Sequence, residues 1–161
     1  MQDIELAFVM PFVDSTHRMF DMMMKQKIVR KEVYIKKNYV MFGDISGTIG
    51  LSGKINGTGA ISLPGPLALK CINDMVGSEV ATSIYDEEVH DGVGELINMI
   101  AGNAKTVLSP TEYAIDFTLP TIISGRGHEL YHKKGTTNLS MVFETGDGLE
   151  FSFDLSTQRN T

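Results

Sequence analysis

The sequence predicts an α+β protein in which helices pack on a largely antiparallel sheet. Three observations lead to this prediction. Apolar residues recur at helical spacing in residues 4–24 and again in residues 67–108. Short β-branched and aromatic runs, separated by glycine, occupy residues 28–63 and 112–155. No linker or low-complexity tract divides these groups, so residues 1–161 are expected to form a single domain.

The first helix is predicted from about Ile4 to Met24, where Pro11 either kinks it or opens its main segment. Strand-like runs follow up to residue 63. Within them, Asn56-Gly57 predicts a hairpin turn, because both central positions of a type I′ turn need positive φ. We therefore expect an antiparallel meander in this part of the chain.

Two further helices are predicted, a short one from Leu67 to Val76 and a longer one from about Tyr85 to Leu108. Cys71 in the short helix is interpreted as a core residue. The second group of strands reads EYAIDFTLPTII, LYHKK, NLSMVFE and LEFSFDL. The last two runs are joined by a Gly-Asp-Gly sequence at residues 146–148, which predicts a hairpin.

Composition narrows the possible functions. The net charge of -6 has the wrong sign for nucleic-acid binding through counterion release, and lysine and arginine do not cluster with aromatic residues. No stretch approaches the roughly 20 apolar residues of a membrane span. The opening MQDIELAF does not resemble a secretory signal, and Cys71 is the single cysteine. We expect a cytoplasmic protein that binds neither nucleic acid nor membrane.

The long helix combines an apolar stripe with an opposite polar ridge. The ridge consists of Asp91, Glu95, Asn98 and Gly102, whose spacings of four, three and four residues make them successive neighbours. Gly94 and Gly102 leave the ridge low, which suggests that something approaches closely there. On spacing alone, an ordinary solvated face remains the better interpretation. The predicted stripe contains Val89, Val93, Leu96, Ile97, Ile100, Ala104 and Val107.

The run DGVGELINMIAGNA, residues 91–104, resembles the signature helix of the CheC/CheX/FliY phosphatases, whose pattern is an Asp or Ser followed by ExxN. The N-terminal VMPFVDSTHRMFDMM also resembles the first helix of CheX-type members. A single copy of the motif favours the CheX type over the CheC type, which typically carries two. Pro120 is slightly displaced from the position of a proline in the family pattern.

The resemblance implies a CheC-like domain with one motif-bearing long helix and a specific activity. Such a protein accelerates hydrolysis of the aspartyl phosphate of a phosphorylated CheY-like receiver domain. By similarity, Asn98 orients the attacking water, and Glu95 docks on the active-site lysine of the receiver. Asp91, Gly94 and Gly102 are expected to contact the same partner. The resemblance also implies a homodimer.

The same resemblance implies that the chain has no cofactor or metal of its own, because the receiver supplies Mg²⁺, the lysine and the phosphorylated Asp. Orienting a water is a sufficient contribution to phosphoryl transfer, whose loose transition state needs little covalent chemistry from the protein. The alternative is a receiver-binding or adaptor domain of chemotaxis or flagellar signalling that binds without accelerating hydrolysis.

Three other signals are weaker. His128 to His132 read HExxH, a zinc-hydrolase pattern, but the flanking glycines leave little room for the helix that the pattern needs, so a strand or loop is expected. The glycine-rich Gly47 to Ile55 fails the spacing of a phosphate-binding loop and is interpreted as turns between strands. Asn103, at the edge of the apolar stripe, is interpreted as a satisfied structural amide.

Overall fold

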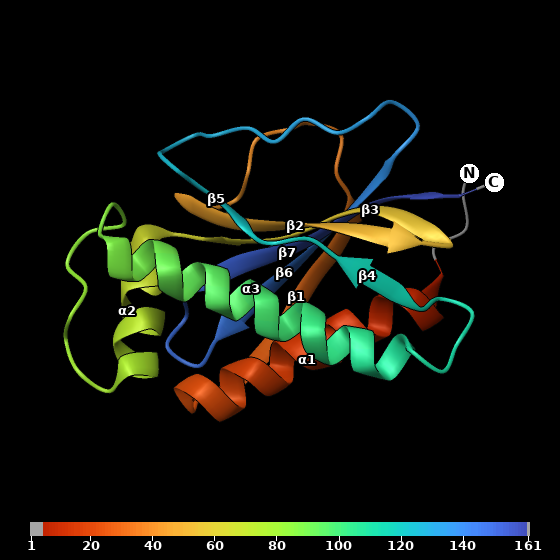
Figure 1. The fold of residues 1–161 in the computed structure, drawn as a ribbon. Coiled ribbons are helices and arrows are strands. Elements are labelled where there is room, and N and C mark those ends of the chain that lie inside the picture. Colours follow the sequence, from red (N-terminus) through yellow and green to blue (C-terminus); the bar gives the residue numbers. More distant parts are fainter. Residues whose placement is uncertain (1–4, 161) are drawn as a thin grey trace.

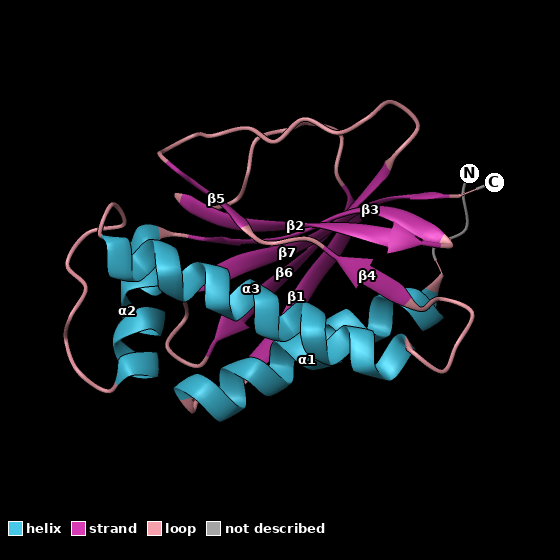
Figure 2. Cartoon of the chain, viewed as in Figure 1, coloured by secondary structure: helices cyan, strands magenta, loops and turns pink. Residues whose placement is uncertain are grey.

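The computed structural model describes residues 5–160, in which three helices cover one face of a seven-stranded sheet (Figure 1). Figure 2 shows the helices and the strands as two separate layers. The predicted α+β class is therefore confirmed. The helices are α1 (Leu6–Met24), α2 (Gly65–Val76) and α3 (Glu87–Leu108). The strands are β1 (Ile28–Ile35), β2 (Ile45–Gly53), β3 (Ile55–Leu63), β4 (Ile115–Phe117), β5 (Thr121–Ser124), β6 (Thr137–Thr145) and β7 (Glu150–Arg159).

The strand pairings are all antiparallel, in the order β1-β6-β7-β3-β2-β4, with β5 also pairing with β2. β4 pairs with residues 51–53 of β2, and β5 pairs with residues 45–48. Two short strands thus share one edge of β2. Residues 118–120, which we call the connector, link β4 to β5 along that edge.

The predicted meander over residues 28–63 is wrong, because β1 does not pair with β2. β1 lies at the far edge of the sheet and pairs with β6, so only β2 and β3 are neighbours within this segment. The hairpin predicted between the last two long strands, β6 and β7, is confirmed.

The turn between β2 and β3 is centred on Lys54, not on Asn56-Gly57. Asn56 and Gly57 lie within β3. The Asn56 Oδ1 accepts a hydrogen bond from Gly53 N at 3.0 Å, which links the end of β2 to the start of β3 across the turn. A Cβ on Gly57 would lie 1.9 Å from the carbonyl oxygen of Ser156 in β7. Glycine is therefore needed at position 57 because β7 approaches closely. The predicted turn at Asn56-Gly57 is wrong.

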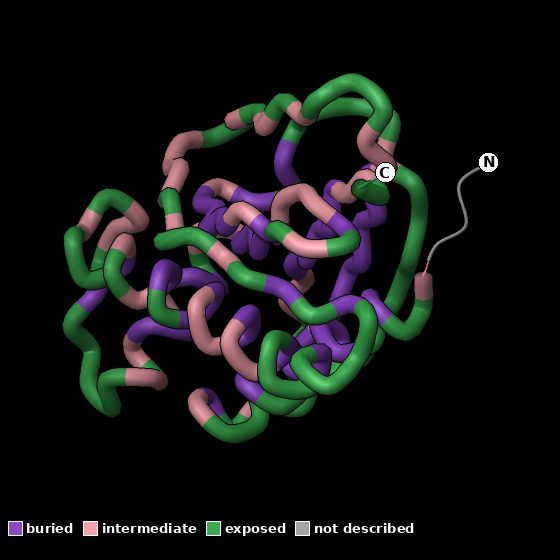
Figure 3. The backbone as a smooth tube through the Cα atoms, turned by 45° about the vertical axis from the view of Figure 1, so that its right-hand side comes forward, coloured by how far each residue is buried: buried purple, intermediate pink, exposed green. Residues whose placement is uncertain are grey.

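The main core lies between the helices and the sheet, and stacked phenylalanines join the two layers. Phe20 of α1 stacks on Phe151 of β7 with ring centroids 4.5 Å apart, and Phe12 stacks on Phe153 at 5.9 Å. Figure 3 shows the buried residues concentrated in the centre of the molecule, along the strands and on the inward sides of the helices. Cys71 is fully buried, as predicted, and burial raises the pKa of its thiol to about 12. No helix within residues 5–160 is long and apolar enough to cross a membrane.

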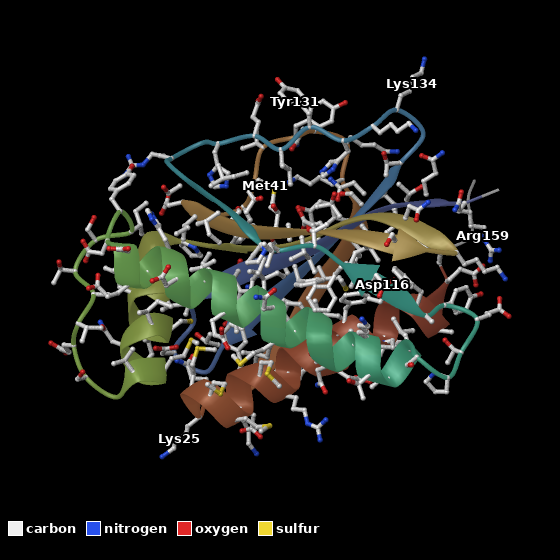
Figure 4. All side chains as sticks on the ribbon, viewed as in Figure 1. Lys25, Met41, Asp116, Tyr131, Lys134 and Arg159 are labelled. Atoms are coloured by element: carbon white, nitrogen blue, oxygen red, sulfur yellow. The ribbon has the colours of Figure 1, made fainter. Side chains whose placement is uncertain are left out.

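The other face of the sheet is polar and is covered by the loops of residues 36–44 and 125–136. Met41 of the first loop is buried over the sheet (Figure 4). Beneath the loops, the Lys36 Nζ lies 3.4 Å from the Asp154 Oδ2, and both side chains are almost fully buried. Burial raises the pKa of Asp154, although the Lys36 ammonium acts in the opposite direction. The LYHKK run, residues 130–134, lies in the second loop, so its prediction as a strand is wrong.

Candidate functional site

Asp86, the residue before the first turn of α3, fixes the loop that leads into the helix. The Asp86 Oδ2 accepts hydrogen bonds from Thr82 N at 2.9 Å and Ser83 N at 3.0 Å, and these bonds lower the pKa of the carboxyl. Glu87 and Glu88 follow in the first turn, where negative charge interacts favourably with the helix dipole. The helix begins two residues after its predicted start at Tyr85.

The inward face of α3 packs closely on β2 and on α2, and glycine allows both contacts. A Cβ on Gly47 of β2 would lie 3.0 Å from Val93 Cγ1 and 3.3 Å from Ile97 Cγ2. A Cβ on Gly92 of α3 would lie 2.3 Å from the Cδ1 of Ile72 in α2. Gly47 is thus a packing position inside β2, and its interpretation as a turn residue is wrong.

The predicted apolar stripe of α3 is confirmed except at its last position. Val107 is 54% exposed, whereas Leu108, the next residue, is buried. The helix ends at Leu108. The buried members of the predicted stripe are Val89, Val93, Leu96, Ile97, Ile100 and Ala104.

The polar ridge of α3 lies on the side away from the sheet. Asp91 and Glu95 are exposed, while Asn98 and Gly102 are half-buried. Within residues 5–160, the side chains of Asp91, Glu95 and Asn98 make no hydrogen bond or ion pair. A carboxylate and an amide one helical turn apart are therefore both available to an external group.

One flank of the ridge is formed by the connector and the ends of β4 and β5, which run beside α3 in Figure 1. Gly94 is buried there, because a Cβ on it would lie 3.5 Å from Pro120 Cγ and 3.6 Å from Ile122 Cδ1. A Cβ on Gly102 would lie 4.0 Å from Phe117 Cζ. These separations are ordinary contacts, so the chain itself occupies the space beside Gly94.

An ion pair ties the C-terminal half of α3 to β4. The Lys105 Nζ lies 3.1 Å from the Asp116 Oδ1 and 5.9 Å from the centroid of the Phe117 ring. Figure 4 shows Asp116 on the strand next to this part of α3. Both charged groups are substantially exposed, so the pair orients the two elements and contributes little free energy.

Comparison with known proteins assigns the family. Residues 45–144, which include β2, β3, α2, α3 and most of β6, match the family described as chemotaxis phosphatase CheX. The chain belongs to the CheX family. This assignment confirms the resemblance inferred from the helix motif.

Individual relatives resemble the chain in sequence and in fold. The CheY-P phosphatase CheX of Thermotoga maritima is 36% identical over 78 residues, which cover 48% of this chain and 50% of that protein. A CheC-like superfamily protein from Shewanella sp. PV-4 superposes with a TM-score of 0.87 at 33% identity, over 96% of this chain and 99% of its own. CheX of Borrelia burgdorferi, crystallised with CheY, BeF₃⁻ and Mg²⁺, gives a TM-score of 0.78 at 24% identity, over 96% of this chain and 100% of its own.

The HExxH run contributes nothing to the CheX-type ridge, because it lies in the loop on the opposite face of the sheet. The His128 Nδ1 donates to the carbonyl oxygen of Gly125 at 2.7 Å, and its Nε2 lies within hydrogen-bonding distance of the Ser46 Oγ, at 2.7 Å. The His132 Nε2 lies 3.1 Å from the Ser156 Oγ. The two histidines thus engage different strands, and the run forms no helix, as expected. Within residues 5–160, no three His, Cys, Asp or Glu side chains are placed to hold a metal ion.

The sequence correctly predicted which ridge residues lie together, but it missed their flank. Nothing in the helix pattern indicated that Gly94 would be covered by Pro120 or that Gly92 would contact α2. A proline within a strand-like run was the available signal, because proline cannot donate to a ladder and interrupts the strand. Asn103 is half-buried and its side chain makes no hydrogen bond within residues 5–160, so its interpretation as a satisfied amide is wrong.

Proposed function

We propose that this chain accelerates hydrolysis of the aspartyl phosphate on a CheY-like receiver domain, with the α3 ridge as its working surface. The observation that carries the proposal is the unengaged pair of Glu95 and Asn98 on one helix of a CheX-family chain. Further support comes from the Thermotoga maritima relative, which is a CheY-P phosphatase and matches this chain along 50% of its own length.

Asn98 is proposed to orient the attacking water. An amide offers a donor and an acceptor together and carries no negative charge to repel the phosphoryl oxygens. Its half-buried position restricts the side chain before the partner arrives, which reduces the entropy that positioning costs. Phosphoryl transfer requires little covalent chemistry, so a positioned water is a sufficient contribution.

Glu95 is proposed to dock on the active-site lysine of the receiver. It lies three residues before Asn98, so the two side chains emerge about 5–6 Å apart at their Cβ atoms. If Asn98 contacts the phosphoryl group, the Glu95 carboxylate lies close to that negative charge and needs a cation as its partner. The lysine of the receiver satisfies that need. Asp91 is proposed to extend the contact by one turn and Gly102 to admit the receiver closely. Gly94 is covered by Pro120, so it would affect the partner only by setting how closely the connector packs on α3.

The chemistry needs no cofactor from this chain in the proposed reaction. The receiver is proposed to supply Mg²⁺, the lysine and the phosphorylated Asp. The Borrelia burgdorferi CheX, a protein of the same fold, was crystallised with CheY, BeF₃⁻ and Mg²⁺, which supports a receiver carrying its own metal as the partner here. The cytoplasm, where response regulators are phosphorylated, is the proposed location.

We further propose a homodimer formed through β1. This strand is an edge of the sheet, and it exposes Val29 by 62% and Val33 by 46%. A long edge strand with exposed apolar side chains favours pairing with another strand. Val33→Lys should give a monomer in sedimentation velocity, with Val107→Lys as the control on an exposed valine outside β1. A dimer that persists in Val33→Lys contradicts this interface.

The decisive experiment compares Asn98→Ala with Asn103→Ala. Both asparagines are half-buried residues of α3, but Asn103 lies off the ridge. Loss of phosphate from a phosphorylated CheY-like receiver is followed in Mg²⁺, alongside a binding measurement. Asn98→Ala should lower the rate by about tenfold or more, equivalent to about 1.4 kcal/mol in the barrier, with binding still measurable. Asn103→Ala should act like the wild type, and full turnover by Asn98→Ala would refute the assignment.

The docking role of Glu95 is tested by charge reversal. Glu95→Lys should weaken the complex with the phosphorylated receiver, because two cations would then face each other. Glu79→Lys places the same charge change on an exposed position of the loop between α2 and α3, outside the ridge, and serves as the control. Equal affinities for the two variants would remove Glu95 from the interface. If the wild-type protein binds the phosphorylated receiver but does not accelerate its hydrolysis, the adaptor function is favoured instead.

A further inference from the structure

Leu119, in the middle of the connector, is the most exposed of the large apolar side chains in residues 5–160, with 86% of its surface accessible. A single exposed leucine needs no explanation by itself, since apolar atoms make up much of any protein surface. Two properties of Leu119 set it apart. Its backbone is held rigidly, and it lies beside the ridge that carries the proposed reaction.

The rigidity comes from hydrogen bonds on both sides of Leu119. Thr118 N donates to the carbonyl oxygen of Gly50 at 3.0 Å, and Gly50 N donates back to the Thr118 Oγ1 at 2.8 Å. After the connector, the Thr48 hydroxyl donates to the carbonyl oxygen of Thr121 at 3.2 Å. The connector is thus anchored to β2 at both ends. A partner that contacts Leu119 therefore pays little entropy for ordering its backbone.

The position of Leu119 follows from the contacts of the connector with α3. The segment runs antiparallel to the helix, from beside Gly102 to beside Gly94. Eight helical residues span about 12 Å, and three extended residues span about 10 Å, so the two paths are nearly equal in length. Leu119 lies two-thirds of the way along this path, which places it about level with residue 97, between Glu95 and Asn98 on the ridge.

Asn98 is the ridge side chain nearest to the connector, because it shares one helical row with Gly94 and Gly102 at intervals of four residues. A standard interface covers about 800 Å² on each partner, a patch roughly 30 Å across. Elements packed side by side lie only about 10 Å apart. A receiver centred on Asn98 would therefore extend over the connector and cover Leu119.

We infer that Leu119 is an apolar docking residue for the receiver domain, which buries it against an apolar side chain beside its phosphorylated aspartate. This inference rests on the proposed function and deepens it. Asn98 acts on the phosphoryl group, and Glu95 supplies a polar contact. Leu119 supplies apolar burial on the opposite flank, so the receiver is held from both sides of the reacting group.

The test uses Leu119→Ser, with Leu6→Ser as the matched control, since Leu6 of α1 is also largely exposed, at 66%. Steady-state hydrolysis of the phosphorylated receiver in Mg²⁺ should show KM raised by about tenfold in Leu119→Ser and kcat unchanged. Leu119→Met, which keeps an apolar side chain of similar size, should restore KM. Leu6→Ser should leave both constants unchanged. Unchanged KM in Leu119→Ser, or a fall in kcat alone, overturns the inference.

A binding measurement separates this inference from the proposed function. The probe is the receiver activated with beryllofluoride and Mg²⁺, which needs no turnover. If the wild type binds this receiver more tightly than Leu119→Ser but does not accelerate hydrolysis, the docking inference holds and the phosphatase proposal fails. If Asn98→Ala loses its rate while Leu119→Ser binds normally, the phosphatase proposal holds and the docking inference fails. A wild type that neither binds nor hydrolyses overturns both.

Discussion

Replacing Gly92 with alanine tests how closely α2 and α3 pack. The added Cβ would lie 2.3 Å from Cδ1 and 3.0 Å from Cγ1 of Ile72, a buried side chain. Gly94, two residues later, provides a matched comparison. Its added Cβ would lie 3.5 Å from the nearest atom, Pro120 Cγ, which is an ordinary contact. The two substitutions therefore make the same backbone change in one helix and differ in the space available.

The expected magnitudes follow from two opposing contributions. Alanine stabilises a helix interior by about 1 kcal/mol relative to glycine, and overpacking a core costs about 1–3 kcal/mol. The helix contribution is common to both variants, so their difference reports the contact with Ile72. We expect Gly94→Ala to raise the free energy of unfolding by about 1 kcal/mol and Gly92→Ala to fall about 1–3 kcal/mol below Gly94→Ala.

The assay is urea unfolding followed by far-UV circular dichroism, because the sequence contains no tryptophan to report by fluorescence. The slope of the free energy of unfolding against urea concentration should match that of the wild type, so that shifts in the midpoint report changes in stability. Adding Ile72→Val to Gly92→Ala removes the Cδ1 atom and should recover part of the loss. Equal free energies of unfolding for Gly92→Ala and Gly94→Ala would refute the packing argument.

Three further predictions concern buried groups. Burial lowers the pKa of His132 from its ordinary 6.5, so its contribution to stability is present above that pH and is lost as the pH falls through the lower folded-state value. The unfolding temperature should therefore fall more on acidification below this pH in the wild type than in His132→Gln. An equal fall in both proteins would contradict this. The Cys71 thiol, with a pKa of about 12, should react with a thiol reagent only when the protein opens, so urea should accelerate labelling; immediate labelling of the native protein would disprove its burial. Lys36→Met leaves the buried Asp154 carboxyl without its cation and should cost about 3 kcal/mol in urea unfolding at neutral pH, whereas an unchanged midpoint would show that the pair contributes nothing.

Local patterns predicted the helices well, because their signals lie within a few residues. The spacing of Val93, Ile97 and Ile100 identified the inward face of α3, and all three are buried. Strand neighbours were harder to predict. Ile28 pairs with Thr145, and no local signal links residues so far apart in the sequence. The glycine at position 57 was misread for a related reason, since its neighbour is a carbonyl of β7 and not a turn partner.

The ridge could be predicted because a single helix displays all of its members. Its flank could not, because the connector reaches α3 only through the pairing of β4 and β5 with β2. The run EYAIDFTLPTII was interpreted as continuous strand sequence, whereas Pro120, which has no N–H, separates two short strands. Leucine at position 119 fits a buried strand as well as a loop. Its exposure follows from the interruption at Pro120, which the sequence pattern did not reveal.

The place of the β6–β7 hairpin in the sheet has a consequence for folding. These two strands lie between β1 and β3, so the C-terminal part of the sequence supplies the middle of the sheet. During synthesis, α1 and β1 emerge more than a hundred residues before the strand with which β1 pairs. Such a high contact order is typical of slow folding. A nascent chain that ends before β6 has one sheet fragment, formed by β2 to β5, and a β1 strand without a partner. The β1 strand and the open edge of β3 are exposed to aggregation until the hairpin inserts between them.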